Sequence, residues 1–203
     1  MVMKFMRIIF GVAFCIALQM PVHAQKIDSS FTVLNNLPQP LEKMVIIFLD
    51  PEKNSQNEKI ISRWGLWDDG AMKIIGDQIA TIISNSGLET KYVGHFPNKA
   101  AYANLLYASG DRYKLVYLPT ALSLGSSTQM HYLVILYSPD SNATPIFQSE
   151  SDLTQHKMAT MNNMSARLLV KKLIDAKIYS PEGKQITPTK MEHDYPPELT
   201  SRY

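Results

Sequence analysis

Residues 44–49, with the sequence MVIIFL, form an unbroken apolar run that ends at Asp50 and Pro51. Its length and its β-branched residues predict a strand buried on both faces, because a strand with one solvated face alternates apolar and polar residues. Residues 132–137 are likewise apolar at both parities. These segments predict the centre of a sheet that other elements cover on both sides.

Helical periodicity predicts three main helices. The clearest covers residues 71–87, where apolar side chains recur on one helical face and Asp68 or Asp69 can cap the free amides of the first turn. Residues 98–108 and 158–176 have similar spacing and predict the other two helices.

The remaining short apolar segments predict further strands, at residues 89–94, 112–119, 130–138 and 145–148. The expected order is β-α-β-α-β-β-β-α. The first two strand-helix-strand steps favour parallel crossovers, and the later strands can form a meander. The sequence therefore predicts an α/β (or α+β) fold with a single mixed sheet of about five strands and three main helices.

The first 24 residues have the pattern of a cleaved export signal. Lys4 and Arg7 precede an apolar stretch over residues 8–18, and small residues precede a predicted cleavage after Ala24. The apolar stretch is too short for a membrane-spanning helix, which needs about 20 apolar residues. We therefore expect a periplasmic or secreted protein that has no transmembrane span once the signal is removed.

Removal of the signal changes the charge and the thiol content. The 203-residue chain has 20 Lys and Arg against 18 Asp and Glu, and its only cysteine is Cys15. Without Lys4, Arg7 and Cys15, the mature chain has 18 residues of each charge sign and no thiol. This balance argues against nucleic-acid binding, which needs surplus positive charge, and it excludes cysteine nucleophiles and disulfides.

The composition divides the mature chain into three parts. Residues 25–42 are polar with scattered apolar residues and predict a leader or linker that either lies on the domain or swings free. Residues 43–179 contain all the periodic segments and predict the α/β domain. Residues 180–203 include four prolines and no sustained period, which is typical of a C-terminal tail that hugs the surface or is disordered.

No common catalytic or metal-binding motif is present, so we assign no catalytic residue, metal or cofactor and do not expect an enzyme. One weak alternative is a small hydrolase that uses Ser126, His131 and Asp140, which have the side-chain types of a catalytic triad. A second version would use His95 together with His131. Such combinations also arise by chance, and structural roles explain these residues with fewer assumptions.

Both tryptophans of the chain, Trp64 and Trp67, lie in the short segment RWGLW before the first predicted helix. They could cover the edge of the sheet, which is the simpler interpretation. They are also the candidate binding residues, because two tryptophans on a loop can anchor a protein partner or a glycan. A carbohydrate-binding module is therefore a further alternative.

The order of elements over residues 42–178 resembles that of small α/β modules exported by Gram-negative bacteria: the N-terminal domain of TolB, the curli secretion lipoprotein CsgG, and lipoprotein activators of penicillin-binding proteins. In this resemblance residues 43–50 correspond to the first strand, residues 131–148 to a long hairpin, and residues 158–176 to the closing helix. Those lipoproteins carry a lipid-attachment cysteine at the cleavage site, whereas Cys15 lies inside the apolar stretch. The resemblance implies an accessory role in an envelope assembly.

Together these features predict an exported accessory or binding protein of the bacterial cell envelope that acts by binding another envelope or secreted protein.

Overall fold

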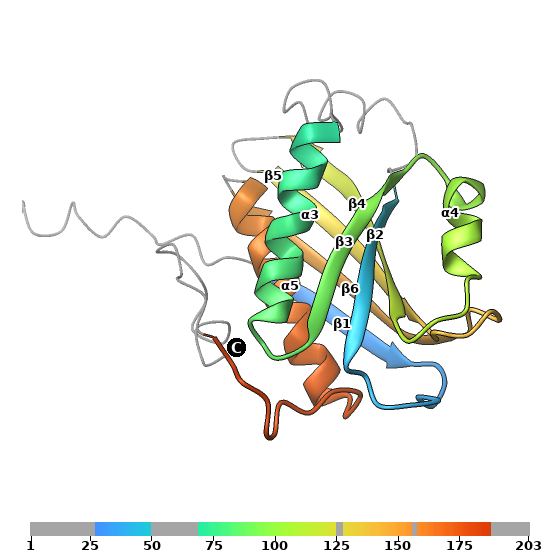
Figure 1. Ribbon diagram of the computed structural model, residues 1–203. Helices are drawn as coiled ribbons and strands as arrows, with labels where there is room; N and C mark the ends of the chain where they lie inside the picture. Colours follow the sequence, from blue (N-terminus) through green and yellow to red (C-terminus); the bar gives the residue numbers. More distant parts are fainter. Residues whose placement is uncertain (1–26, 50–68, 125–127, 156–157, 188–203) are drawn as a thin grey trace, which may run out of the picture.

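The computed structural model describes residues 27–49, 69–124, 128–155 and 158–187. Within these residues, one six-stranded sheet carries three helices (Figure 1). The elements in chain order are β1 (Ile27–Val33), β2 (Lys43–Leu49), α3 (Asp69–Ser84), β3 (Glu89–Phe96), α4 (Lys99–Leu106), β4 (Tyr113–Leu124), β5 (Thr128–Tyr137), β6 (Pro145–Gln155) and α5 (Met158–Asp175).

The sheet is mixed, and its strands lie in the order β1-β6-β5-β4-β2-β3. β2 is parallel to both of its neighbours, β3 and β4. β4, β5 and β6 form an antiparallel meander, and β1 pairs antiparallel with β6. The predicted α/β class, the single mixed sheet and the three helices are confirmed.

The sheet has six strands rather than about five. The additional strand, β1, lies within residues 25–42, which the sequence indicated to be a leader. Its sequence, IDSSFTV, has neither an apolar run nor sustained alternation, so its local pattern does not specify a strand. Pairing with β6, which places Phe31 opposite Ser149 and Val33 opposite Phe147, gives the segment its strand conformation.

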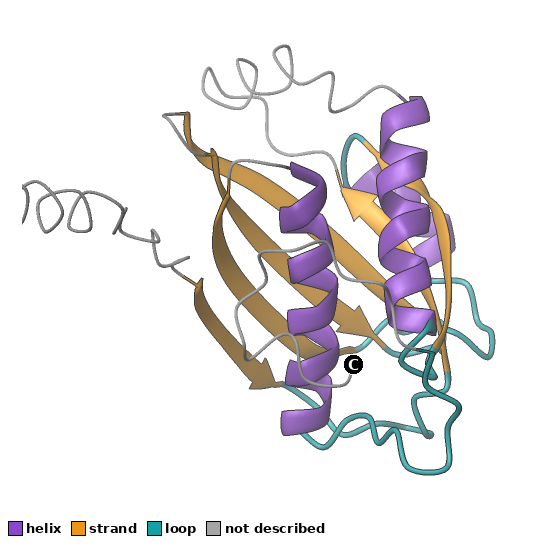
Figure 2. Cartoon of the chain, turned by 90° about the vertical axis from the view of Figure 1, so that its left-hand side faces the viewer, coloured by secondary structure: helices purple, strands orange, loops and turns teal. Residues whose placement is uncertain are grey.

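The helices divide between the two faces of the sheet (Figure 2). α3 and α5 cover one face, where alternate residues of the central strands, such as Met44, Ile46 and Phe48, join the main core. α4 covers part of the other face, where Tyr102 and Leu106 form a smaller core with residues of β2 and β4. The prediction that both faces of the sheet centre are covered is thus confirmed.

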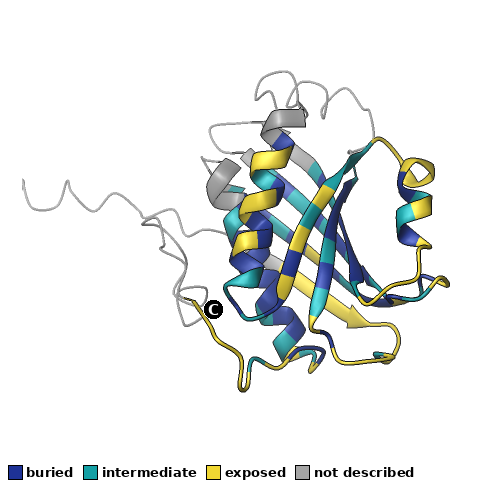
Figure 3. Ribbon diagram, in the orientation of Figure 1, coloured by how far each residue is buried: buried dark blue, intermediate teal, exposed yellow. Residues whose placement is uncertain are grey.

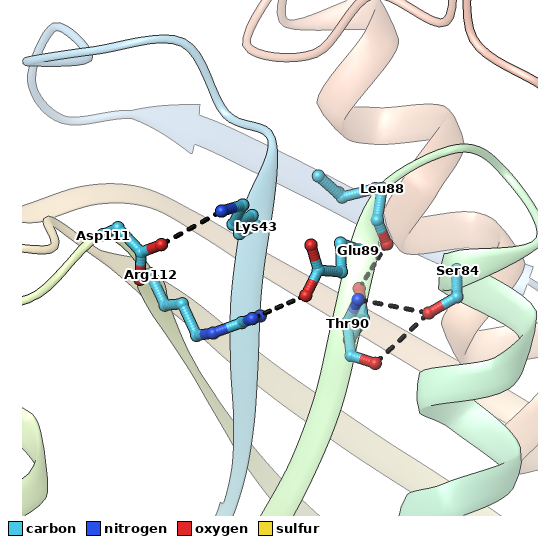
Figure 4. A network of polar contacts seen from close by, with 7 residues as sticks. All are labelled: Lys43, Ser84, Leu88, Glu89, Thr90, Asp111 and Arg112. Carbon is cyan, nitrogen blue, oxygen red and sulfur yellow. Dashed lines mark hydrogen bonds and ion pairs between the residues drawn. The ribbon is translucent and has the colours of Figure 1, made fainter.

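Polar contacts join the start of the parallel strands to the end of α3 (Figure 4). Arg112 donates to Glu89 at 2.5 Å, and this hydrogen bond holds the pKa of the Glu89 carboxyl below its ordinary value. The hydroxyl of Ser84 in α3 accepts a hydrogen bond from the backbone N–H of Thr90 at 3.1 Å and donates one to the carbonyl of Thr90 at 3.2 Å. These contacts fix the register at which α3 leads into β3.

α3 approaches the sheet most closely at Gly76. A Cβ atom added there would lie 2.3 to 2.5 Å from three carbons of the Tyr92 ring. That ring in turn packs edge-on against Phe48, with ring centroids 5.7 Å apart. The helix can therefore lie on β3 at this depth only because residue 76 has no side chain.

None of the helices in the described part of the chain is both long enough and apolar enough to cross a membrane.

Candidate functional site

β1 forms one edge of the sheet. It pairs with β6 on one side, and no described strand pairs with its other side. An edge strand that lacks a neighbour presents unpaired backbone N–H and C=O groups, which can bind another strand. Figure 3 shows β1 exposed from Ser29 to its end, whereas the strands at the sheet centre are largely buried.

One hydrogen bond shows which backbone groups of β1 point outward. The N–H of Leu34 donates to the carbonyl of Ile146 at 2.8 Å, so residue 34 points its backbone toward the β6 side. In an antiparallel pair this direction alternates with each residue. Ser30 and Thr32 therefore point inward, and Ser29, Phe31 and Val33 present their N–H and C=O groups at the open side. We call these outward groups the β1 edge.

The β1 edge is flanked by exposed apolar side chains. Phe31 is 40% exposed and Val33 is 47% exposed, and Leu34 follows at 42%. Phe31 and Val33 lie on the same sheet face as α5, because their partners in β6, Ser149 and Phe147, are buried there. The Phe31 ring stacks on the Phe147 ring, with centroids 5.9 Å apart. Backbone donors, acceptors and apolar area thus lie together along one strand.

A buried lysine of α5 holds β1 in place. The Nζ of Lys172 donates to the carbonyls of Ser30 at 2.9 Å and Glu150 at 2.6 Å. It also donates to the hydroxyls of Ser149 at 2.8 Å and Ser151 at 2.9 Å. Because Ser30 and Glu150 are partners across β1 and β6, one ammonium group ties the helix to both strands.

Burial lowers the pKa of Lys172 from 10.5 to about 8, and the nearby charge of Glu150 opposes this shift. An amine of this pKa can act as a general base, and the two serine hydroxyls beside it are the type of group that acts as a nucleophile. However, Lys172 is 4% exposed, Ser149 3% and Ser151 6%. A substrate cannot reach these groups while α5 covers them, so their role is structural.

The opposite edge of the sheet, β3, differs from β1. The register between β2 and β3 shifts so that Ile46 faces Tyr92 and Ile47 faces Gly94. Val93 is therefore an extra residue, and it is 45% exposed. Such an irregularity, together with the charged Lys91 nearby, is a common device that discourages the pairing of an edge strand. β1 has no bulge, proline or lysine.

The structure brings His131 together with an aspartate, but not with Asp140. The Nδ1 atom of His131 lies 2.7 Å from Oδ1 of Asp152, its cross-strand partner in β6. Asp140 follows the other end of β5, where its side chain accepts the N–H of Asn142 at 2.8 Å. Tyr137 lies six residue steps along β5 from His131, which corresponds to about 20 Å. Ser126 lies outside the described residues.

The structure does not bring His95 and His131 together. His95 is in β3 and His131 in β5, and β2 and β4 lie between these strands. Three strand spacings place the two backbones about 14 Å apart, which exceeds the combined reach of two imidazoles. Within the described residues, no three His, Cys, Asp or Glu side chains group in a way that could hold a metal ion.

The candidate binding residues Trp64 and Trp67 also lie outside the described residues, so their role stays a prediction. Sequence reasoning missed the β1 edge and Lys172. The alternation of Phe31 and Val33 with Ser30 and Thr32 was the available signal for β1, but it extends over too few residues to stand out. Helical periodicity was the available signal for Lys172, which lies four residues after Leu168 and three after Leu169 and so falls on the apolar face of α5, whereas Lys171 does not.

No protein-family model matches the chain, and no curated protein matches it. Among solved structures, the chain is similar to the PelC dodecamer from Paraburkholderia phytofirmans, with 13% sequence identity and a TM-score of 0.43. A variant of that PelC dodecamer with one substitution gives 11% identity and the same TM-score. Both comparisons cover 81% of this chain and 100% of the other. Similarity at this level supports no conclusion about function.

Proposed function

We propose that this chain is an exported, non-enzymatic binding protein of the bacterial cell envelope, and that its β1 edge binds an extended segment of a second polypeptide. The observation that carries the proposal is the combination of outward backbone groups at Ser29, Phe31 and Val33 with the exposed side chains of Phe31 and Val33.

Strand addition suits this edge for two reasons. Main-chain hydrogen bonds supply affinity, and side chains that alternate along the strand supply specificity. The edge is also rigid before binding, because Lys172 ties Ser30 to β6 and α5. A binding surface that is already ordered loses less conformational entropy when a partner arrives.

The location in the proposal rests on sequence. The export pattern of residues 1–24 supports a periplasmic or secreted protein, and the neutral, cysteine-free remainder supports recognition by shape rather than by charge. We also propose a relationship to the exported modules exemplified by the TolB N-terminal domain and CsgG. The order of elements from β2 to α5 supports it.

Site-specific photo-crosslinking in the native envelope tests the proposal. A photoreactive residue at position 33 should capture a polypeptide, and one at position 31 should capture the same segment about two residues further along, because paired strands run in register. The matched control is position 93, a valine of almost equal exposure (45% against 47%) on the opposite edge. Equal capture from positions 33 and 93, or no capture from position 33, contradicts the proposal.

A second candidate function, a small hydrolase, is favoured by the contact between His131 and Asp152. A carboxylate at Nδ1 orients the imidazole so that Nε2 can accept a proton from a nucleophile. The pair is accessible, with His131 28% and Asp152 37% exposed. If Ser126 is the nucleophile, Ser126→Ala and His131→Ala should each abolish hydrolysis of p-nitrophenyl acetate by the purified chain. Unchanged hydrolysis in both variants excludes this candidate.

A further inference from the structure

We infer that the polypeptide at the β1 edge is a second copy of this chain, with the two β1 strands antiparallel about a two-fold axis at Phe31. This inference rests on the proposed binding role of the β1 edge and names its partner. It joins two six-stranded sheets into one continuous sheet.

The β1 edge is complementary to itself in this register. The two-fold axis places Phe31 opposite its own copy, Ser29 opposite Val33, and Ser30 opposite Thr32. Because Ser29, Phe31 and Val33 all point their backbone groups outward, every outward residue meets another outward residue. The two strands can then exchange about six hydrogen bonds without disturbing the pairing of β1 with β6.

The side chains also match. Directly opposed residues of a hydrogen-bonded antiparallel pair have Cα atoms about 5.5 Å apart, so the Phe31 rings of the two copies come within contact distance. Phe31 already stacks on Phe147 at 5.9 Å. Pairing therefore joins the two Phe31–Phe147 stacks into one row of four rings and covers part of the surface that each Phe31 exposes to water.

Charge favours pairing between the β1 strands of two copies over pairing of β1 with another strand of a second copy. Asp28 is the only charged residue of β1, and the axis places it opposite Leu34 rather than opposite another Asp28. A head-to-tail contact would instead join β1 to β3 of the next copy, where the extra residue Val93 and the charge of Lys91 interrupt a regular ladder. The expected product is therefore a closed pair and not an open chain.

Sedimentation velocity of the purified chain at several concentrations tests the inference. We expect a reversible equilibrium between monomer and dimer. Phe31→Lys places two like charges at the axis and should raise the dimer dissociation constant at least tenfold. The matched control is Ile74→Lys, which should leave the dissociation constant unchanged. Ile74 is 62% exposed, and its helix, α3, packs against β3 at the opposite edge of the sheet from β1.

A second variant separates dimerisation from folding. The N–H of Val33 points outward, so Val33→Pro removes a donor that only a partner strand would use, and the monomer should keep its melting temperature within a few degrees. The N–H of Leu34 is bonded to Ile146, so Leu34→Pro should lower the melting temperature of the monomer itself. Val33→Pro should be monomeric at every concentration at which the wild type is dimeric.

Disulfide trapping tests the register. In a Cys15→Ser background, Phe31→Cys should form a covalent dimer under mild oxidation, because the opposed Cα atoms lie at the usual disulfide separation. Thr32→Cys should not, because the two copies of residue 32 are offset along the strands and lie about 8 Å apart. A dimer trapped by Thr32→Cys but not by Phe31→Cys overturns the inferred axis.

The outcomes distinguish this inference from the proposed function. A chain that is monomeric at all concentrations, yet captures a different protein from position 33, retains the binding function and overturns self-pairing. A dimer that tolerates both Phe31→Lys and Val33→Pro also overturns it, because the contact then lies elsewhere. A monomer that captures nothing overturns both.

Discussion

Gly76→Ala is expected to lower the free energy of unfolding by about 2 kcal/mol, although alanine is the better helix former. The added Cβ atom would lie 2.3 to 2.5 Å from carbons of the Tyr92 ring, including Cγ, which rotation of the ring about the Cβ–Cγ bond does not move, so Tyr92 must change its χ1 rotamer or the backbone must shift. Overpacking of this kind costs about 1 to 3 kcal/mol or more, and the gain of up to about 1 kcal/mol from helix propensity offsets it only in part.

Thermal or urea unfolding of two companion variants checks the cause. Gly110→Ala is the matched control, because an added Cβ atom there meets nothing within 4 Å and stability should hardly change. In a Tyr92→Ala background the second substitution, Gly76→Ala, should no longer destabilise, since the ring that it contacts is gone. A Gly76→Ala protein more stable than the wild type would contradict the close packing of α3 on β3.

We expect the free energy of unfolding to rise by about 2 kcal/mol between pH 7.5 and pH 9.5, chiefly because of Lys172. Its pKa is about 8 in the folded protein, against an ordinary value of 10.5. Between these two values the unfolded chain binds more protons than the folded one, so stability increases with pH. Above about pH 10 the trend reverses, because tyrosines ionise in the unfolded chain while buried ones such as Tyr102, with a pKa of about 12, resist ionisation.

Urea unfolding at several pH values should assign the rise to a single residue. Lys172→Met should remove most of it, and the part that remains belongs to Lys114, whose pKa burial also lowers. Lys171→Met is the matched control. Lys171 is the next residue along α5, and its side chain is 36% exposed and paired with Asp175, so its substitution should leave the pH dependence intact. A Lys172→Met protein with the wild-type slope contradicts this assignment.

β2 and β1 illustrate which strands a local sequence pattern can predict and which it cannot. Residues 44–49 are apolar at every position, and the structure places Ile46 in the core under α3 and α5 and Ile47 in the core under α4. β1 has a mixed pattern, and its strand conformation depends on β6 and on the contact between Lys172 and Ser30. Contacts between the two ends of the chain leave no local signal.

The candidate histidine site shows a similar limit. His131 has Asp140 close by in the sequence, but the register of β5 on β6 places it beside Asp152 instead. Register depends on how the whole hairpin pairs, and a shift of one residue would move Asp152 to the other face of the sheet. The types of side chain were therefore predictable, whereas the pair that forms was not.

By itself, the sequence determined the α/β class, the order of the main elements and the burial of the central strands on both faces, because hydrophobic periodicity is a local property that each element needs in order to join a core. Only the tertiary structure decided which strand ends the sheet, which backbone groups stay open there, and which groups of β1 and β6 bind the ammonium of Lys172. These features depend on strand order and register, which contacts between distant parts of the chain set.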